Sequence, residues 1–307
     1  MHEFVQGRPV KKVLLIGLLV PILFPAQIGF AQPIKVFVSI LPQKYFVEKI
    51  GGDLVDASVM VQPGASPATY EPKPRQMVAL AKSRVYFAIG VPFEATWLEK
   101  IAATNSRLHV VHTEAGIERM PMKPDHLHAG RRRQVEIEQG NDHHGVKDPH
   151  IWLSPPLVMQ QARTIFRTLA SLDPVNLASY ENNYKKFIME LVELDLELRK
   201  VFERRVEHHD FMVFHPSWGY FARSYGLRQV PLEIEGKKPK PEELKDLVQY
   251  ANEIGARVIF VQPQFSQQAA RTIAQSIGGQ IVVVDPLALD WANNLREVAS
   301  EFKEALR

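Results

Sequence analysis

Three side chains of types that bind metal ions, His150, His215 and Asp285, lie near the ends of predicted strands or loops. His215 directly follows the apolar segment 211–214, and Asp285 directly follows the segment 281–284. Ligands of open α/β sheets bind outside the carboxyl ends of the strands. Two imidazoles and one carboxylate suit Zn²⁺, Mn²⁺ or Fe²⁺.

Each of these residues also has an ordinary structural explanation. A single histidine near a strand end is usually a hydrogen-bonded polar residue, and an aspartate before a proline, such as Asp285 before Pro286, usually forms a turn. Spacing along the chain does not by itself join His150, His215 and Asp285 into one site.

The first half of the chain alternates predicted strands with predicted helices. Short apolar or β-branched segments that end at Pro or Gly predict strands. The predicted strands are 34–41, 55–61, 84–89 and 108–112, and the helices are a short one ending at residue 50, then 74–82 and 93–103. This alternation predicts a parallel sheet with helices on both faces.

The second half repeats this alternation after two further helices. We predict helices over 156–172 and 176–206, strands over 211–214, 229–234, 257–261 and 280–284, and helices over 217–225, 241–254, 267–277 and 291–306. Apolar residues recur every three or four positions through 176–206, a helix that would span roughly 45 Å. A coiled-coil seam is the alternative, but a backbone between two lobes fits this length better. The predicted fold class is therefore α/β, with two parallel-sheet lobes joined by one long helix.

The N-terminus has the pattern of a secretory signal peptide. Two lysines, Lys11 and Lys12, precede the apolar run 13–24, and small residues follow up to Ala31. A membrane anchor is the alternative, but this run is shorter than the roughly 20 residues that a spanning helix needs. We predict cleavage near Ala31 and a periplasmic location, with lobes over 32–174 and 209–307 and the linking helix over 175–208.

The composition narrows the possible functions. Hydrophobic residues make up 46% of the 307 residues and charged residues 23%, which is typical of a folded globular protein. The net charge of +3 comes without a basic stripe, so nucleic acid is not an expected partner. Because the chain has no cysteine, disulfides, thiolate metal sites and a lipidated N-terminal cysteine are excluded.

Residues 125–147 interrupt the pattern of strands and helices. This stretch is rich in charge and contains four histidines, His126, His128, His143 and His144, together with three consecutive arginines. We predict a surface loop, for which a solvated charged stretch is the simpler interpretation and collection of metal before transfer is the alternative.

Four motifs resemble those of the zinc- and manganese-binding receptors of ABC importers, the zinc-uptake component A family. The second and third motifs are the most specific of the four. The motifs are Gly-Ala-Ser-Pro-Ala-Thr-Tyr-Glu-Pro (64–72), Asp-Pro-His-Ile-Trp-Leu-Ser-Pro (148–155), Phe-His-Pro-Ser-Trp-Gly-Tyr-Phe (214–221) and Val-Asp-Pro-Leu (284–287). The resemblance implies two α/β lobes joined by one rigid helix, with a metal site in the cleft between the lobes.

The resemblance also implies that His150, His215 and Asp285 are the metal ligands. The first motif departs from the family, because Ala68 stands where a ligand histidine is usual and a methyl group cannot bind metal. Three protein ligands plus water is one solution. Glu71, His128 and His143 are candidates to fill the remaining position.

The implied function is capture of a divalent metal and its delivery, as a monomer, to the membrane permease of an ABC importer. Histidine at position 215 favours Zn²⁺, with Mn²⁺ and Fe²⁺ as alternatives, because manganese prefers oxygen-rich sites. A metalloenzyme, an adhesin, or a receptor for ferric iron or a chelated metal are competing hypotheses. The sequence contains neither a His-Glu-x-x-His nor a Gly-x-Ser-x-Gly motif, so we predict no enzymatic activity.

Overall fold

The computed structural model describes residue 2 and residues 32–103, 105–122, 147–203, 209–233 and 241–306. The chain divides into Met1–Gln32 and Pro33–Arg307, and the fold below is that of the second unit. The predicted signal peptide (1–31) and nearly all of the predicted histidine-rich loop lie outside the described residues. Within the described residues, no helix combines the length and apolar character needed to cross a membrane.

The first lobe is built on a four-stranded parallel sheet with the strand order β2-β1-β3-β4. Its central strands β1 and β3 are mostly buried apolar runs, as expected where helices cover both faces of a sheet. The strands are β1 (Ile34–Val38), β2 (Val55–Val59), β3 (Val85–Ala88) and β4 (His109–His112), and the helices are α1 (Leu41–Gly51), α2 (Pro74–Leu80) and α3 (Pro92–Ala103).

The second lobe repeats this topology with the order β6-β5-β7-β8, again all parallel. Pro231, which cannot donate to a ladder, lies at the end of the edge strand β6. The strands are β5 (Asp210–Val213), β6 (Arg228–Pro231), β7 (Val258–Val261) and β8 (Gln280–Val283), and the helices are α6 (Gly219–Ser224), α7 (Pro241–Glu253) and α8 (Gln268–Ser276).

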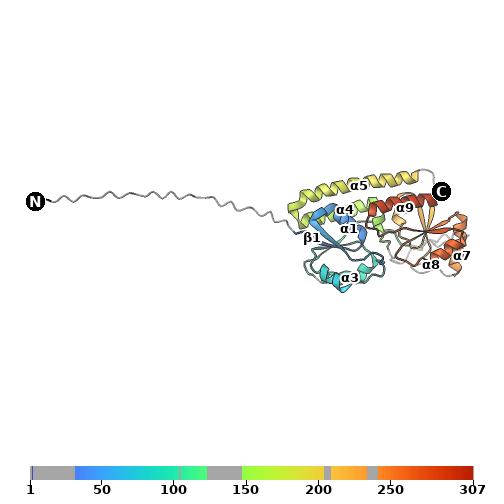
Figure 1. The fold of residues 1–307 in the computed structure, drawn as a ribbon, viewed down its shortest axis with the longest axis horizontal. Helices are drawn as coiled ribbons and strands as arrows, with labels where there is room; N and C mark the ends of the chain where they lie inside the picture. The colour runs from blue at the N-terminus through green and yellow to red at the C-terminus, as the bar shows by residue number, and fades with distance from the viewer. Residues whose placement is uncertain are drawn as a thin grey trace, which may run out of the picture. The chain divides into compact units, whose positions relative to one another are not determined.

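One long helix, α5 (Leu177–Glu203), runs beside both lobes (Figure 1). Its 27 residues span roughly 40 Å. Its buried side chains recur every three or four positions, the spacing of one helix face, and they are Tyr180, Phe187, Leu191, Leu194, Leu198 and Phe202. This face packs against α1, α4 (Pro155–Leu172) and the C-terminal helix α9 (Trp291–Ala305). The predicted fold of two parallel-sheet lobes joined by a long helix is confirmed.

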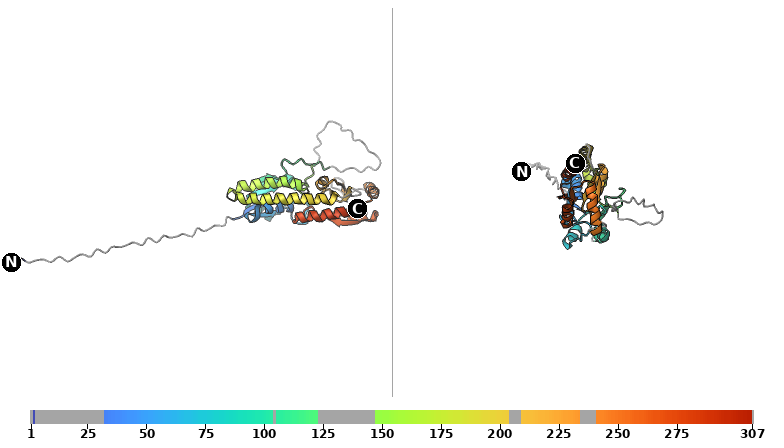
Figure 2. Two further views of the ribbon diagram at one scale, coloured as in Figure 1. Left: turned by 90° about the horizontal axis from the view of Figure 1, so that it is seen from above. Right: turned by 90° about the vertical axis from the view of Figure 1, so that its right-hand side faces the viewer.

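The last helix, α9, also belongs to both lobes, and Figure 2 shows it alongside α5. At its start, the Trp291 ring packs edge-on against Phe46 of α1, with 5.1 Å between the ring centroids. Near its end, the Phe302 ring lies 4.2 Å from the ring of Phe211 in β5. A single cluster of buried apolar residues therefore extends from the first sheet into the second.

Two hydrogen bonds donated by tryptophan side chains connect segments of the two lobes. The short 3₁₀ helix η2 (Ile151–Leu153) contains Trp152, whose Nε1 donates to the carbonyl of Pro286 at 2.7 Å. The carbonyl of Trp152 accepts from Nε1 of Trp291 at 2.8 Å. The segment that carries His150 is thus fixed to the segment that follows β8.

Candidate metal-binding site

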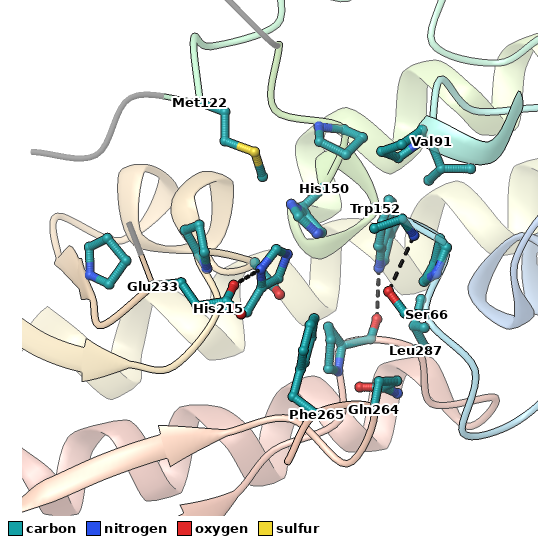
Figure 3. Close-up of a pocket in the computed structure, with 18 residues that line it drawn as sticks. Ser66, Val91, Met122, His150, Trp152, His215, Glu233, Gln264, Phe265 and Leu287 are labelled. Atoms are coloured by element: carbon teal, nitrogen blue, oxygen red, sulfur yellow. Dashed lines mark hydrogen bonds and ion pairs between the residues drawn. The ribbon is translucent and has the colours of Figure 1, made fainter. Parts of the chain in front are cut away.

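A cavity of about 500 Å³ lies where the loops of the two lobes meet (Figure 3). The loop after β2 contributes Ala68, the segment before η2 contributes His150, and the segment after β5 contributes His215. Because β2 and β5 end at this edge of their sheets, the cavity occupies the position expected for a ligand site of parallel α/β sheets.

One wall of the cavity depends on the turn between β3 and α3, which supplies Val91. Gly90 has a positive φ of 82°, a backbone conformation that favours glycine because it has no Cβ atom. The buried Glu94 carboxyl accepts from the amides of Ile89 and Gly90 and fixes the start of α3. Burial raises the pKa of Glu94 to about 7.

The two predicted histidine ligands come together in the cavity. The ring centroids of His150 and His215 lie 5.4 Å apart, with an angle of 73° between the ring planes. Two imidazoles bound through Nε2 to one tetrahedral zinc ion, with Zn–N near 2 Å, would have centroids about 5.2 Å apart. The observed separation therefore matches that of two histidine ligands on one ion.

Each histidine has a buried carboxylate behind it. His150 Nδ1 lies 2.7 Å from Asp148 Oδ1, and His215 Nδ1 lies 2.7 Å from Glu233 Oε2. An ionised carboxylate only accepts hydrogen bonds, so each Nδ1 is the donor, and in the neutral imidazole this leaves the lone pair of Nε2 for a metal. This carboxylate–histidine arrangement is the one that orients histidine ligands in zinc sites.

Burial favours the neutral form of His215. It lowers the pKa of the imidazole below its usual value of 6.5, although the hydrogen bond to Glu233 opposes this effect. The His215 amide also donates to Gln262 Oε1 at 3.2 Å, which holds the backbone of this segment. A neutral ring with a fixed tautomer is the form that binds a metal.

Asp285, the third predicted ligand, is not brought into this group. Its Oδ1 accepts from Gln264 Nε2 at 2.7 Å and from the amide of Leu287 at 2.9 Å. It lines a neighbouring cavity of about 370 Å³, and Gln264 lines both cavities. The turn that Asp285 forms with Leu287 is the ordinary role of an aspartate before a proline.

Three further residues, Glu71, His128 and His143, were candidates for the remaining metal-ligand position. Glu71 is exposed and does not line the cavity, whereas His128 and His143 lie outside the described residues. Across the described ranges, no group of three or more His, Cys, Asp or Glu side chains is arranged to hold a metal ion. In the described part of the chain, the histidine and acidic side chains that line the cavity are His150, His215 and Glu233, and Glu233 is bonded to His215 Nδ1.

Sequence reasoning missed the two carboxylates behind the histidines. Glu233 follows β6, which pairs with β5, and His215 follows β5, so the carboxyl ends of neighbouring strands place them together. That rule could have found Glu233. Asp148 lies two residues before His150, and its side chain accepts from the His150 amide at 2.9 Å, as in an Asx turn.

Comparison with known protein families establishes the family to which this chain belongs. Residues 36–305 match the family described as "Zinc-uptake complex component A periplasmic". The chain belongs to this family. The resemblance predicted from the four motifs is confirmed, and with it a component of a transport system rather than an enzyme.

Individual members of the zinc-uptake component A family and their solved structures agree with this assignment. The "High-affinity zinc uptake system protein ZnuA" of Bacillus subtilis (strain 168) is 27% identical over 258 residues, which are 83% of this chain and 78% of that protein. A crystal structure of ZnuA is 43% identical with a TM-score of 0.82, over 90% of this chain and all of that one. A zinc-bound deletion mutant of ZnuA is also 43% identical, with a TM-score of 0.79 over 89% of this chain and 98% of that one.

Replacing Glu233 by glutamine is expected to lower zinc affinity by about 10- to 100-fold. The amide can still accept from His215 Nδ1, but the negative charge that makes the imidazole a stronger ligand is lost. Competition with a chromophoric zinc indicator measures the change. Glu253→Gln is the matched control, since Glu253 is exposed and bonded to Gln249 on α7. Unchanged affinity in Glu233→Gln would remove the carboxylate from the site.

Proposed function

We propose that this chain is the extracytoplasmic receptor of a zinc importer, which captures Zn²⁺ at His150 and His215 and delivers it to an ABC permease. The observation that carries the proposal is the pair of imidazoles from two lobes, at a centroid separation of 5.4 Å, each oriented by a buried carboxylate. Membership of the zinc-uptake component A family supports the same function.

Zinc is the metal that the donor set favours. Imidazole nitrogen suits Zn²⁺, whereas Mn²⁺ prefers carboxylate, carbonyl and water oxygens. The relatives named above are described as a zinc uptake protein and as a zinc-bound ZnuA variant. Asp285 joins the site in this proposal only if the metal draws it away from Gln264 and Leu287.

The remaining features of the proposal concern location and assembly. Residues 1–31 act as a cleaved signal peptide, and the mature chain works in the periplasm as a monomer, without a nucleic-acid partner. The family description, with the word "periplasmic", supports this location. We place the lobes at 32–174 and 209–307, joined by a linking helix at 175–208.

The test is the metal content of the protein purified from its natural compartment. Elemental analysis is expected to find roughly one zinc ion per chain, in excess of manganese and iron. Purification from the periplasmic fraction tests the location in the same experiment. Protein recovered without a transition metal, or loaded with manganese, would contradict the proposal.

A further inference from the structure

We propose that Tyr220 is a positioning residue for zinc capture, because its hydroxyl fixes the two imidazoles of the cavity relative to each other. The inference rests on the proposed function and adds a residue to the groups that perform it. Tyr220 lies on α6, five residues after His215 in the motif 214–221. Its side chain is buried and does not line the cavity, so it acts on a bound metal only through other residues.

The Tyr220 hydroxyl makes two hydrogen bonds, and both reach the part of the chain that precedes α4. It accepts from the Met120 amide at 2.9 Å and donates to the Asp148 carbonyl at 3.0 Å. Burial raises the pKa of Tyr220 to about 12, so the hydroxyl keeps its proton at neutral pH. Because a tyrosine hydroxyl has one proton to donate, its whole donor capacity is used on the backbone of Asp148.

The backbone of Asp148 is held from two sides. Its amide donates to the Met120 carbonyl at 2.8 Å, so the Tyr220 hydroxyl closes a small network in which all three residues are bonded. A Cβ atom added at Gly219 would lie 3.2 Å from Asp148 Oδ2, which shows how closely the start of α6 approaches this carboxylate. The position of Asp148 therefore follows the position of α6.

The position of Asp148 in turn determines that of His150. Asp148 Oδ1 accepts from the amide of His150 at 2.9 Å and lies 2.7 Å from its Nδ1. Pro149 stands between them, with a fixed φ and no amide proton, and a proline also restricts the backbone of the residue before it. A displacement of Asp148 is thus passed on to the His150 ring rather than absorbed by the intervening residue.

The same segment of the second lobe carries the other imidazole. His215 directly follows β5 and its first turn, and its amide and its carbonyl are both bonded to the side chain of Gln262. One short stretch, 215–220, therefore places the His215 ring and, through Tyr220, the His150 ring. Since Zn–N distances stay near 2 Å, a zinc ion that binds both rings tolerates little change in their 5.4 Å centroid separation.

Tyr220→Phe tests this role, because it removes the hydroxyl and keeps the ring. Residues that orient metal ligands are worth about 10- to 100-fold in affinity, and Tyr220 acts one step further from the metal, so we expect about a tenfold loss of zinc affinity. Competition with a chromophoric zinc indicator at one fixed pH measures it.

Tyr225→Phe is the matched control from the end of the same helix. Tyr225 is also buried, its hydroxyl donates to Asp195 Oδ1 on α5 at 3.1 Å, and it does not line the cavity. This variant loses a buried tyrosine hydroxyl of the same kind, so a general loosening of the fold would affect both variants. We expect its zinc affinity to equal that of the unmodified chain.

A double-mutant cycle with Asp148→Ala tests whether Tyr220 acts through Asp148. Asp148→Ala already frees the His150 ring, so adding Tyr220→Phe should then lower zinc affinity by less than about threefold. The visible absorption spectrum of bound Co²⁺ depends on the geometry of its ligands and gives a second readout. The spectrum of Tyr220→Phe should differ from that of the unmodified chain, and the spectrum of Tyr225→Phe should match it.

The outcomes distinguish the role of Tyr220 from zinc capture itself. Unchanged zinc affinity in Tyr220→Phe, an equal loss in Tyr225→Phe, or an equal effect of Tyr220→Phe with and without the Asp148 carboxylate would each overturn the inference while zinc capture stands. If the unmodified chain retains no zinc and the natively purified protein contains none, the proposed function fails, and the inference fails with it.

Discussion

Replacing both His150 and His215 by alanine is expected to abolish zinc retention in the natively purified protein. Both imidazoles that face the cavity are removed, and Asp148 and Glu233 lose the rings that they orient. Since the supporting carboxylates alone are worth about 10- to 100-fold in affinity, losing the ligands themselves should cost more than about 100-fold. Elemental analysis beside the unmodified protein measures the effect.

The chain offers a matched control for this double variant. His109 and His112 lie on β4, and both are exposed. Exchanging this pair for alanine removes the same number of imidazoles from the same chain, so zinc content should stay at the level of the unmodified protein. Equal zinc content in the two double variants would show that the metal binds elsewhere.

The second large effect is on stability, and it concerns Trp152. Replacing this residue by alanine is expected to lower the free energy of unfolding by about 3–5 kcal/mol. The ring is 1% exposed and packs 5.1 Å from the His150 ring, and its Nε1 holds the Pro286 carbonyl of the other lobe. Truncation leaves a large void and removes the partner of that carbonyl. Urea denaturation of both proteins measures the difference.

Trp97→Ala is the control for this prediction. Trp97 lies on α3, is only partly buried and contacts the Lys100 ammonium on the same helix. The same chemical change should therefore cost much less there. If both variants lost equal stability, the junction between the lobes would not depend on Trp152.

Local patterns were enough to predict the fold. Short apolar runs ended by Pro or Gly located all eight strands of the described residues to within a few positions, because burial on both faces of a parallel sheet requires such runs. The three- and four-residue spacing located α5, predicted over 176–206 and observed over Leu177–Glu203. Each of these signals lies within one segment of the chain.

The site could be predicted only in part, since it depends on contacts between distant segments. The meeting of His150 and His215 followed from the motif resemblance. Asp285, the third predicted ligand, instead accepts a hydrogen bond from Gln264. The two residues lie in different loops, so no local sequence pattern predicts this contact. Glu233 could have been found, because functional side chains gather at the carboxyl ends of parallel strands. The predicted strand 229–234 included Glu233 as a strand residue, so it was not recognised as lying at a strand end.

The apolar cluster shared by the two sheets has a consequence for protein engineering. Cutting the chain between α5 and β5 would leave α9 with the second fragment, and Tyr45 and Phe46 of the first fragment would lose their contacts with the Trp291 ring. Each fragment would expose to water the apolar surface that the other fragment covers in the intact chain, and would tend to aggregate rather than fold alone. The two sheets have the topology of separate domains, but we expect the two lobes to fold only when they are expressed together in one chain.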